Sequence, residues 1–265
     1  MVTFETKVWE NDWKYILTGN YLDRLIDRCH FPFEEKTLII NNVSNRGLVQ
    51  KYAENKVRKG IIDHYYFAED YADETLAFFN LTKDSFKGGY YYSIGELVSI
   101  YLCKTDYLLH FSSDTFLPKD KIAWIEEALK VFKSRKDIIV ANPSWNYSFK
   151  SAKKESMDEN DLFYIGYGFS DQCYLIKTDI FRQRIYNETN DFSERYPKYG
   201  GQLFEKRVDS FMRNNHLLRI SSKKKTYIHR NFPKNSFYYN CCFLDKVYAW
   251  YRLLRYGFRL AWIRY

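Results

Sequence analysis

A short apolar run over residues 107–111 ends at residues that could do chemistry, Ser112, Ser113 and Asp114. The run predicts a buried strand, and the polar residues follow at its carboxyl end. Sheets built from alternating strands and helices bind ligands at that end, where a carboxylate can hold a metal ion or contact a ribose. The alternative is a core strand that ends in a polar turn, with Asp114 as a plain cap.

Around Asp114, the first half of the chain alternates between strand and helix patterns. Apolar runs or alternation predict strands at residues 3–9, 37–41, 61–67, 107–111 and 138–141. Helical spacing of apolar residues lies between them, at residues 12–29, 46–58, 92–104 and 119–135, while 73–87 is ambiguous. This order is typical of a largely parallel sheet with helices on both faces. The loops after the second, third and fourth strands would then meet at one edge, bringing the acids Glu69 and Asp70 towards Asp114.

The second half of the chain is less regular. Residues 146–161 are polar and rich in Lys and Glu, and residues 187–201 are polar with Pro and Gly, so both predict loops, the first of them mobile. Strand patterns lie at residues 162–167, 172–177, 217–221 and 226–229. Residues 202–215 predict a helix.

Size and composition allow one large domain or two small ones, since the chain has 265 residues of which 46% are hydrophobic. The net charge of +8 favours an anionic ligand or surface, which could be nucleotide phosphate, nucleic acid or acidic lipid. Five cysteines without CxxC spacing predict a reducing compartment, with no zinc site and no disulfide framework. There is no signal-peptide pattern and no apolar run of membrane-spanning length, which predicts a cytoplasmic protein.

The C-terminal segment, residues 243–265, has a composition of its own. Drawn as a helix, it places Arg252, Arg255 and Arg259 on one stripe, with aromatic and aliphatic residues over most of the remainder. Such a helix suits peripheral contact with anionic head groups on the inner face of a membrane. The alternative is a helix docked on the domain with its arginines in water.

The order of these pieces resembles the GT-A glycosyltransferases, especially the inverting family 2 type. Six segments carry the resemblance in the family's order, at residues 38–45, 107–114, 172–181, 192–197, 204–213 and 227–229. They are similar to the second strand with its turn, the strand that ends in Asp-x-Asp, the acceptor-side strand, the Phe-Asp-Glu loop, the Glu-Asp helix and a late strand that ends in His. The resemblance implies an α/β, Rossmann-like GT-A domain over residues 1–242. Its nucleotide-sugar half would be 1–141 and its acceptor half 142–242, with the amphipathic helix of 243–265 after it.

The resemblance also implies a donor site, formed by Asn41, Ser44, Ser112, Ser113, Asp114 and Arg230. Asn41 and Ser44 would face the base and the ribose, although helix capping explains them almost as well. A divalent cation, Mn²⁺ or Mg²⁺, would be held by Asp114 and His229 and would neutralise the charge of the departing diphosphate. A lone histidine is more often structural, and that alternative for His229 stays open.

On the acceptor side, an inverting transferase needs a general base that deprotonates the acceptor hydroxyl. The family's carboxylate lies at the start of a late helix, where Glu205 or Asp209 could serve in this chain. Asp171, just before the acceptor-side strand, could bind sugar hydroxyls.

Three positions depart from the family's pattern. Asn41 stands in place of the usual nucleotide-contacting Asp, and Ser112 in place of the first Asp of Asp-x-Asp. Lys206 stands in place of the Asp of the Glu-Asp pair if Glu205 is its Glu. The site is therefore either adapted or has lost its metal or its activity.

The sequence thus predicts a metal-assisted hexosyltransferase that moves a sugar from a nucleotide-sugar donor to a glycan or lipid-linked glycan in polysaccharide synthesis. One alternative is a glycosyltransferase-like binding protein without activity, motivated by the missing acids. Another is a single-stranded nucleic-acid-binding protein, motivated by the positive charge and an aromatic content of 20%. The basic residues are interspersed with acids along the chain and form no nucleic-acid motif, which disfavours this class.

Overall fold

The computed structural model describes residues 1–197 and 200–229. The strands are β1 (Val2–Val8), β2 (Glu35–Ile40), β3 (His64–Phe67), β4 (Tyr107–Phe111), β5 (Thr115–Phe116), β6 (Ile138–Trp145), β7 (Asp158–Glu159), β8 (Phe163–Gly166), β9 (Cys173–Lys177) and β10 (Leu218–His229). The helices are α1 (Trp13–Leu17), α2 (Tyr21–Asp27), α3 (Arg46–Arg58), α4 (Ala68–Phe79), α5 (Tyr90–Leu102), α6 (Trp124–Ser134), α7 (Phe149–Glu155), α8 (Thr178–Phe181) and α9 (Phe204–Asn214), with short 3-10 turns η1 (Asp84–Phe86) and η2 (Asp191–Arg195).

Within the described residues, the strands form one ten-stranded sheet in the order β3–β2–β1–β4–β9–β6–β10–β8–β7, and β5 pairs with β10. The first four strands of this order run parallel. Strand β9 runs antiparallel to both β4 and β6, and β10 runs parallel to β6. As a result, one edge of the sheet holds the start of β9 and the carboxyl ends of five other strands, β1, β2, β4, β6 and β10. Loops from distant parts of the chain therefore meet at this edge.

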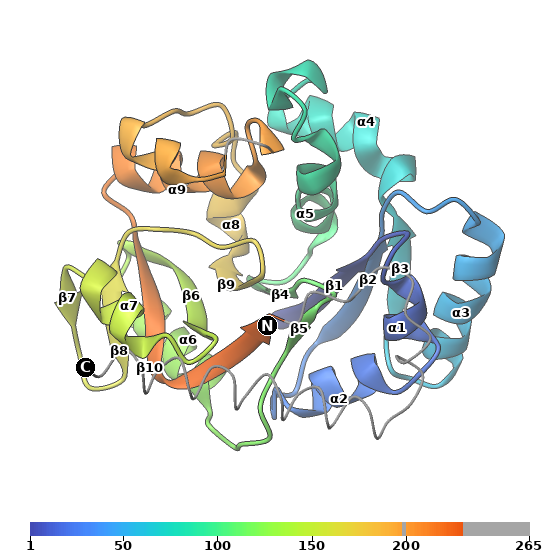
Figure 1. The fold of residues 1–265 in the computed structure, drawn as a ribbon, viewed down its shortest axis with the longest axis horizontal. Coiled ribbons are helices and arrows are strands. Elements are labelled where there is room, and N and C mark those ends of the chain that lie inside the picture. Colours follow the sequence, from blue (N-terminus) through green and yellow to red (C-terminus); the bar gives the residue numbers. More distant parts are fainter. Residues whose placement is uncertain (198–199, 230–265) are drawn as a thin grey trace, which may run out of the picture.

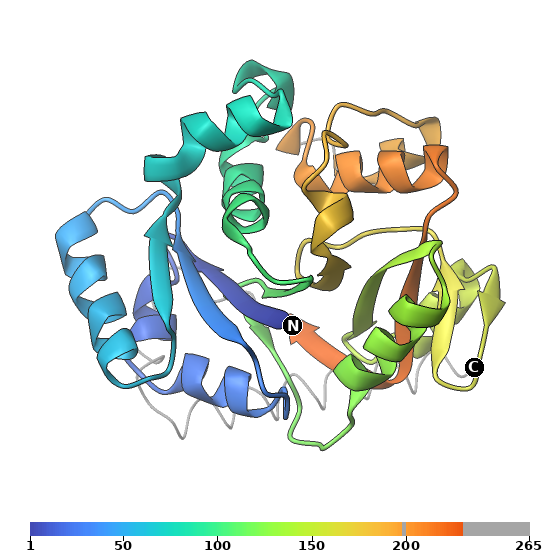
Figure 2. The same cartoon turned by 180° about the vertical axis from the view of Figure 1, so that it is seen from behind.

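Helices cover both faces of the sheet, as the two opposite views show (Figures 1 and 2). The core on one face takes its side chains from α4, α5, α8 and α9, and the core on the other from α1, α2, α3 and α6. Phe204 is buried in the first core and Trp124 in the second. Each such side chain stabilises the fold by roughly 1.5–3 kcal/mol through apolar area removed from water.

The predicted alternation of strands and helices over the first 141 residues is confirmed, and the ambiguous stretch at 73–87 contains most of α4 and η1. The prediction of helix 12–29 holds with a break near Gly19, where α1 ends and α2 follows. The strands expected at 217–221 and 226–229 are one strand, β10, with a register shift between Ser221 and Thr226.

Two loop predictions were wrong. Residues 146–161 contain α7 and β7 rather than only a loop, and α7 buries none of its side chains, so it lacks the apolar period that sequence reading depends on. The acids Glu69 and Asp70 lie in the first turn of α4, where Asp70 pairs with Arg46 on the surface, 2.5 Å away. Strands β2 and β1 lie between β3, which leads into α4, and β4, which leads to Asp114.

The predictions for Arg230 and for residues 243–265 concern positions outside the described residues. Among the helices that the structure describes, none has the length and apolar character that crossing a membrane requires.

Gly201, shortly before α9, allows its loop to approach the backbone of Lys87 closely. Gly201 has φ +66°, and a Cβ there would lie 2.2 Å from the carbonyl oxygen of Lys87. Gly60 has nearly the same φ, +67°, but no atom within 4 Å of its Cβ position. We expect Gly60→Ala to cost about 1–2 kcal/mol of unfolding free energy through backbone strain. Gly201→Ala should cost clearly more, because the backbone around Lys87 must also move.

Thermal unfolding of the two variants measures this difference. A change of 1 kcal/mol shifts the Tm of a domain near this size by roughly 2–4 °C. Equal decreases in Tm for the two variants would show that the backbone around Lys87 can move without a loss of unfolding free energy.

Candidate active site

The sequence-predicted residues Asp114 and His229 are brought together at the sheet edge. Asp114 Oδ2 lies 2.7 Å from His229 Nε2, and both side chains are mostly buried. The cause is local: β5 pairs antiparallel with the end of β10, with Thr115 opposite His229. The backbone N–H of His229 also donates to Asn146 Oδ1 at 3.0 Å, which fixes the end of β10.

Ser112 completes this group. Its hydroxyl donates to Asp114 Oδ1 at 2.9 Å. Burial raises the pKa of Asp114, but the hydrogen bonds and charge from His229 and the bond from Ser112 outweigh it, so the pKa lies below its ordinary value. The carboxylate is therefore ionised at neutral pH, as a ligand for a hard cation must be.

The donor set fits a divalent cation of the Mn²⁺ or Mg²⁺ type that takes two ligands from the protein. Among the residues that the structure describes, no three acid, His or Cys side chains gather to hold a metal. Asp114 and His229 offer one carboxylate oxygen and one imidazole nitrogen, and a cation between them would replace their hydrogen bond. Such ions are commonly held by one or two side chains, with substrate phosphates and water as the other ligands. Two protein ligands therefore suffice.

Gln172, which sequence reasoning missed, orients His229 from the other side. Its Nε2 lies 3.3 Å from His229 Nδ1, and its Oε1 accepts from the hydroxyl of Tyr227 at 3.3 Å. In this arrangement His229 Nδ1 accepts, so Nε2 carries the proton that is donated to Asp114. Gln172 stands directly before β9, so the antiparallel start of that strand delivers it to the same edge.

Asp12 was also missed by sequence reasoning. It is buried, accepts a short hydrogen bond from the hydroxyl of Ser113, and accepts from the backbone N–H of Trp9 at 2.8 Å. It therefore ties the turn after β4 to the loop after β1. Burial raises the pKa of Asp12 to about 7.

The raised pKa of Asp12 predicts a pH-dependent stability. The unfolded chain ionises this carboxyl near pH 3.8 and the folded chain near pH 7, so its contribution to stability is full below pH 3.8 and is lost as the pH rises through 7. Asp12→Asn removes this titration. We expect the Tm of the variant minus that of the wild type to increase by several degrees between pH 4 and pH 8. Asp73→Asn, at an exposed position on α4, is the control for the change in net charge, and its Tm difference should stay flat. If the Tm difference of Asp12→Asn is equally flat, the pKa of Asp12 is not raised in the folded chain.

Asn41 and Ser44 lie at the same edge, but their side chains hold the loops. Asn41 is buried, and its Nδ2 donates to the carbonyl of Tyr91 on α5 at 2.9 Å. The backbone N–H and the hydroxyl of Ser44 both donate to the carboxylate of Glu10, at 2.7 and 2.8 Å. These bonds join the loops after β1 and β2 to each other and to α5.

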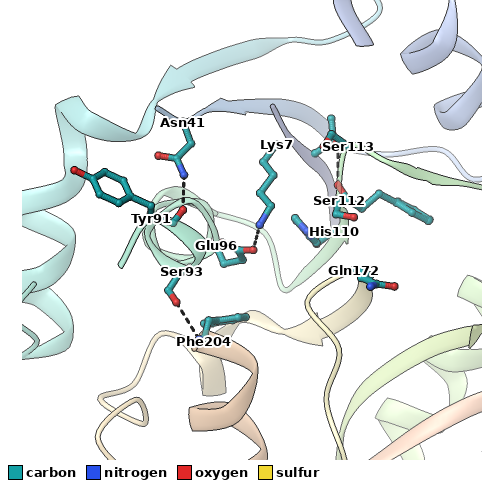
Figure 3. A network of polar contacts seen from close by, with 12 residues as sticks. Lys7, Asn41, Tyr91, Ser93, Glu96, His110, Ser112, Ser113, Gln172 and Phe204 are labelled. Atoms are coloured by element: carbon teal, nitrogen blue, oxygen red, sulfur yellow. Dashed lines mark hydrogen bonds and ion pairs between the residues drawn. The ribbon is translucent and has the colours of Figure 1, made fainter. Parts of the chain in front are cut away.

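A cluster of charged side chains lies between α5, α9 and the sheet. Lys7 at the end of β1 forms a short ion pair with Glu96 on α5, next to His110 of β4 (Figure 3). Burial disfavours the charge on Lys7, but Glu96 and Asp171 outweigh it and raise its pKa. Burial also raises the pKa of Glu96.

Glu205, predicted as a general base, belongs to this cluster. It stands in the first turn of α9, whose start is held against α5 because the backbone N–H of Phe204 donates to the Ser93 hydroxyl at 3.0 Å (Figure 3). Burial and the neighbouring Asp171 carboxylate raise the pKa of Glu205 to about 9. Asp171 and Gln172 are consecutive, so one turn links the Glu205 cluster to the Asp114–His229 pair.

Asp209, the other predicted base, is not brought to the edge. It is fully buried, where it accepts from Arg213 Nε at 2.8 Å and from the Ser193 hydroxyl at 2.7 Å. Its carboxylate holds η2 against α9.

Comparisons with known proteins identify the fold. No protein-family model matches the chain, and no curated protein matches its sequence. Among solved structures, GalNAc-T7 with UDP, GalNAc and Mn²⁺ matches 86% of the chain with a TM-score of 0.53 at 11% sequence identity. The chain has the GT-A fold. It spans 43% of the length of the GalNAc-T7 chain.

Two more distant structures are similar to the chain. Glucosyl-3-phosphoglycerate synthase from Mycobacterium tuberculosis, with Mn²⁺, UDP and glucosyl-3-phosphoglycerate, gives a TM-score of 0.46 at 10% identity, covering 88% of this chain and 73% of its own. Mouse xyloside xylosyltransferase 1 gives 0.44 at 12% identity, covering 82% and 83%. The expectation of a GT-A fold is thus confirmed by GalNAc-T7, and the roles of the edge residues rest on their own geometry.

Proposed function

We propose that the chain is a glycosyltransferase that moves a sugar from a nucleotide-sugar donor to a hydroxyl of a glycan or lipid-linked glycan. The Asp114–His229 pair carries this proposal, because it puts an ionised carboxylate and an imidazole 2.7 Å apart at the carboxyl edge of a GT-A sheet. Ligands of such sheets bind at this edge.

In this proposal, Asp114 and His229 hold a divalent cation, Mn²⁺ or Mg²⁺, with Ser112 supporting the carboxylate. The cation neutralises the diphosphate of the donor when bound. Ser113, fixed by Asp12, holds the turn that carries Asp114, and Asn41 and Ser44 shape the wall beside the nucleotide. Arg230, the next residue after His229, is a candidate for the diphosphate.

Glu205 is the proposed general base. The proton of the acceptor hydroxyl passes to its carboxylate, the acceptor oxygen bonds to the anomeric carbon, and the bond to the diphosphate breaks with its electron pair on the leaving oxygen. A single displacement of this kind inverts the anomeric carbon. Asp171, next to Glu205, is the proposed partner of an acceptor hydroxyl. Asp209 accepts hydrogen bonds from Arg213 and Ser193, so we propose a structural role for it, in holding η2 against α9.

The test is a panel of UDP- and GDP-sugars with Mn²⁺, scored by release of the nucleoside diphosphate from the full chain. We expect hydrolysis or transfer with at least one donor, and inverted configuration in the product by NMR. Nucleotide binding without turnover would favour a binding protein that has lost activity. Salt-sensitive binding to single-stranded nucleic acid, with no nucleotide-sugar binding, would favour the nucleic-acid class instead.

We also propose that residues 243–265 contact a membrane surface peripherally, supported by the arginine stripe in their sequence. Liposome flotation of the full chain is compared with a chain that ends at residue 242. Equal flotation on anionic vesicles would remove this proposal.

A further inference from the structure

A second feature is a cavity of about 310 Å³ between α7 and the strands β6 and β10. Its lining includes Asn142, Ser144, Trp145, Gln172, Arg219 and Tyr227. Pockets for small ligands begin at roughly 300 Å³, so this one suits a single sugar ring or a similar small molecule.

The cavity adjoins the proposed reaction centre. Gln172, one of its walls, lies 3.3 Å from His229 Nδ1, and His229 contacts Asp114. Tyr227, another wall, bonds to Gln172 at 3.3 Å. A ligand in the cavity is therefore separated from the Asp114–His229 pair by one side chain, and Gln172 is next in the sequence to Asp171, the proposed partner of an acceptor hydroxyl.

The lining has the chemistry of a carbohydrate site with one added charge. Most lining side chains carry hydroxyl or amide groups, which can exchange hydrogen bonds with sugar hydroxyls. Trp145 is 47% exposed and offers an apolar face to the C–H side of a sugar ring. Arg219 supplies a guanidinium, which is the side chain suited to a planar or tetrahedral oxyanion.

Arg219 is poised to bind an anion. Its side chain is only 14% exposed, and the nearest carboxylate, that of Glu155 on α7, is 3.5 Å away and 51% exposed. Among the residues that the structure describes, the guanidinium donates no hydrogen bond, although it has five N–H donors. The Cβ position of Gly168 lies 3.2 Å from Arg219 Cζ and 2.9 Å from Arg195 Nη2, so two guanidinium groups flank one glycine. Arg195 is paired with the Asp209 carboxylate at 3.8 Å and is not part of the cavity lining, so Arg219 is the guanidinium that a ligand in the cavity would meet.

We propose that this cavity is the acceptor subsite, and that the acceptor is a sugar or polyol that carries an oxyanion bound by Arg219. The proposal rests on the proposed glycosyltransferase function for its role, but the binding of the anion does not depend on it. Glu155 lies where the oxyanion would bind and competes with it for Arg219. The oxyanion is a carboxylate, as in a uronic acid, or a phosphate, as in a sugar phosphate.

The test measures binding of three probes to the full chain by calorimetry: glucuronate, glucose 6-phosphate and the neutral methyl glucoside. We expect at least tenfold tighter binding of one anionic probe than of the glucoside. The preferred probe tells whether the anion is a carboxylate or a phosphate. Arg219→Gln should remove that preference, Arg219→Lys should keep part of it, and Glu155→Gln should strengthen it several-fold.

Failure of this inference can be told apart from failure of the proposed function. The proposal is overturned if no probe binds, if the glucoside binds as well as the anions, or if folded Arg219→Gln or Arg219→Lys keeps the full preference. Donor hydrolysis by the wild-type chain without added acceptor is scored in parallel. Anion binding at Arg219 in a chain that hydrolyses no donor would leave the cavity assigned and remove the transferase.

Discussion

Asp114→Asn is expected to lower the turnover of a nucleotide sugar about 10³-fold. The substitution keeps the shape of the side chain, and an amide oxygen can still accept from Ser112. It removes the one carboxylate of the Asp114–His229 pair, and with it the charge that would hold a divalent cation in the proposed mechanism. Fixed charge stabilisation of this kind is worth several kcal/mol in a transition state, and 1.36 kcal/mol is tenfold in rate. Initial rates over a series of Mn²⁺ concentrations measure the effect.

Asp70→Asn is the matched control for Asp114→Asn. Asp70 is also hydrogen-bonded to the side chain of a basic residue, Arg46, but on the surface at α4. We expect its turnover and Mn²⁺ dependence to equal those of the wild type. His229→Gln should raise the Mn²⁺ concentration needed for half-maximal rate. Full turnover by Asp114→Asn would remove the metal-assisted mechanism.

The fold and the meeting of Asp114 with His229 could be predicted because they rest on local patterns. Asp114 follows a predicted strand and His229 ends another, and the carboxyl ends of such strands meet at one edge. The two residues lie 115 positions apart in the sequence. Each could still be recognised from its own segment, as a polar residue at the end of a strand pattern. Residues 217–221 and 226–229 also have strand patterns. In the structure both belong to β10, with a register shift between Ser221 and Thr226.

The contacts of the other site residues could not be predicted, because their side chains are held by partners far away in the sequence. Lys7 and Glu96 lie 89 positions apart, and Asp12 and Ser113 lie 101 apart. Each sits in a stretch whose local pattern indicates only a strand or a helix. Their pairing follows from the strand order β2–β1–β4–β9, which brings α5 over β1. Asp12 had a local signal as the residue before α1, but that signal indicates a helix start and not a contact with Ser113.

The electrostatics of Glu205 and Asp209 separate the two bases that the sequence predicted as alternatives. Glu205 lies in a cluster of three carboxylates and one lysine, and its pKa is raised to about 9. A carboxyl group in that state is a strong proton acceptor once ionised, but few molecules are ionised at neutral pH. Asp209 lies one turn later on α9, and its charge is matched by Arg213. The two residues should therefore respond in opposite ways to neutral substitution.

Glu205→Gln is expected to lower kcat about 10²–10⁴-fold, which is the usual contribution of a positioned base. In the wild type, kcat/KM should rise about tenfold per pH unit between pH 6 and 8 and level off near pH 9, because only ionised Glu205 accepts the proton. The variant should show no such rise. A wild-type profile that is flat over this range would exclude Glu205 as the base.

Thermal unfolding of Glu205→Gln and Asp209→Asn separates a proton acceptor from a structural carboxylate. Glutamine imitates the neutral form that folded Glu205 keeps up to about pH 9, so Glu205→Gln should unfold at or above the wild-type Tm at pH 8. Asp209→Asn should do the reverse, because it leaves the Arg213 guanidinium, 16% exposed, without its charged partner. We expect it to lower Tm by several degrees while the surviving folded fraction keeps its kcat. A variant of Glu205 that loses both stability and turnover would mean that this carboxylate holds α9 in place, as Asp209 does, and takes no proton.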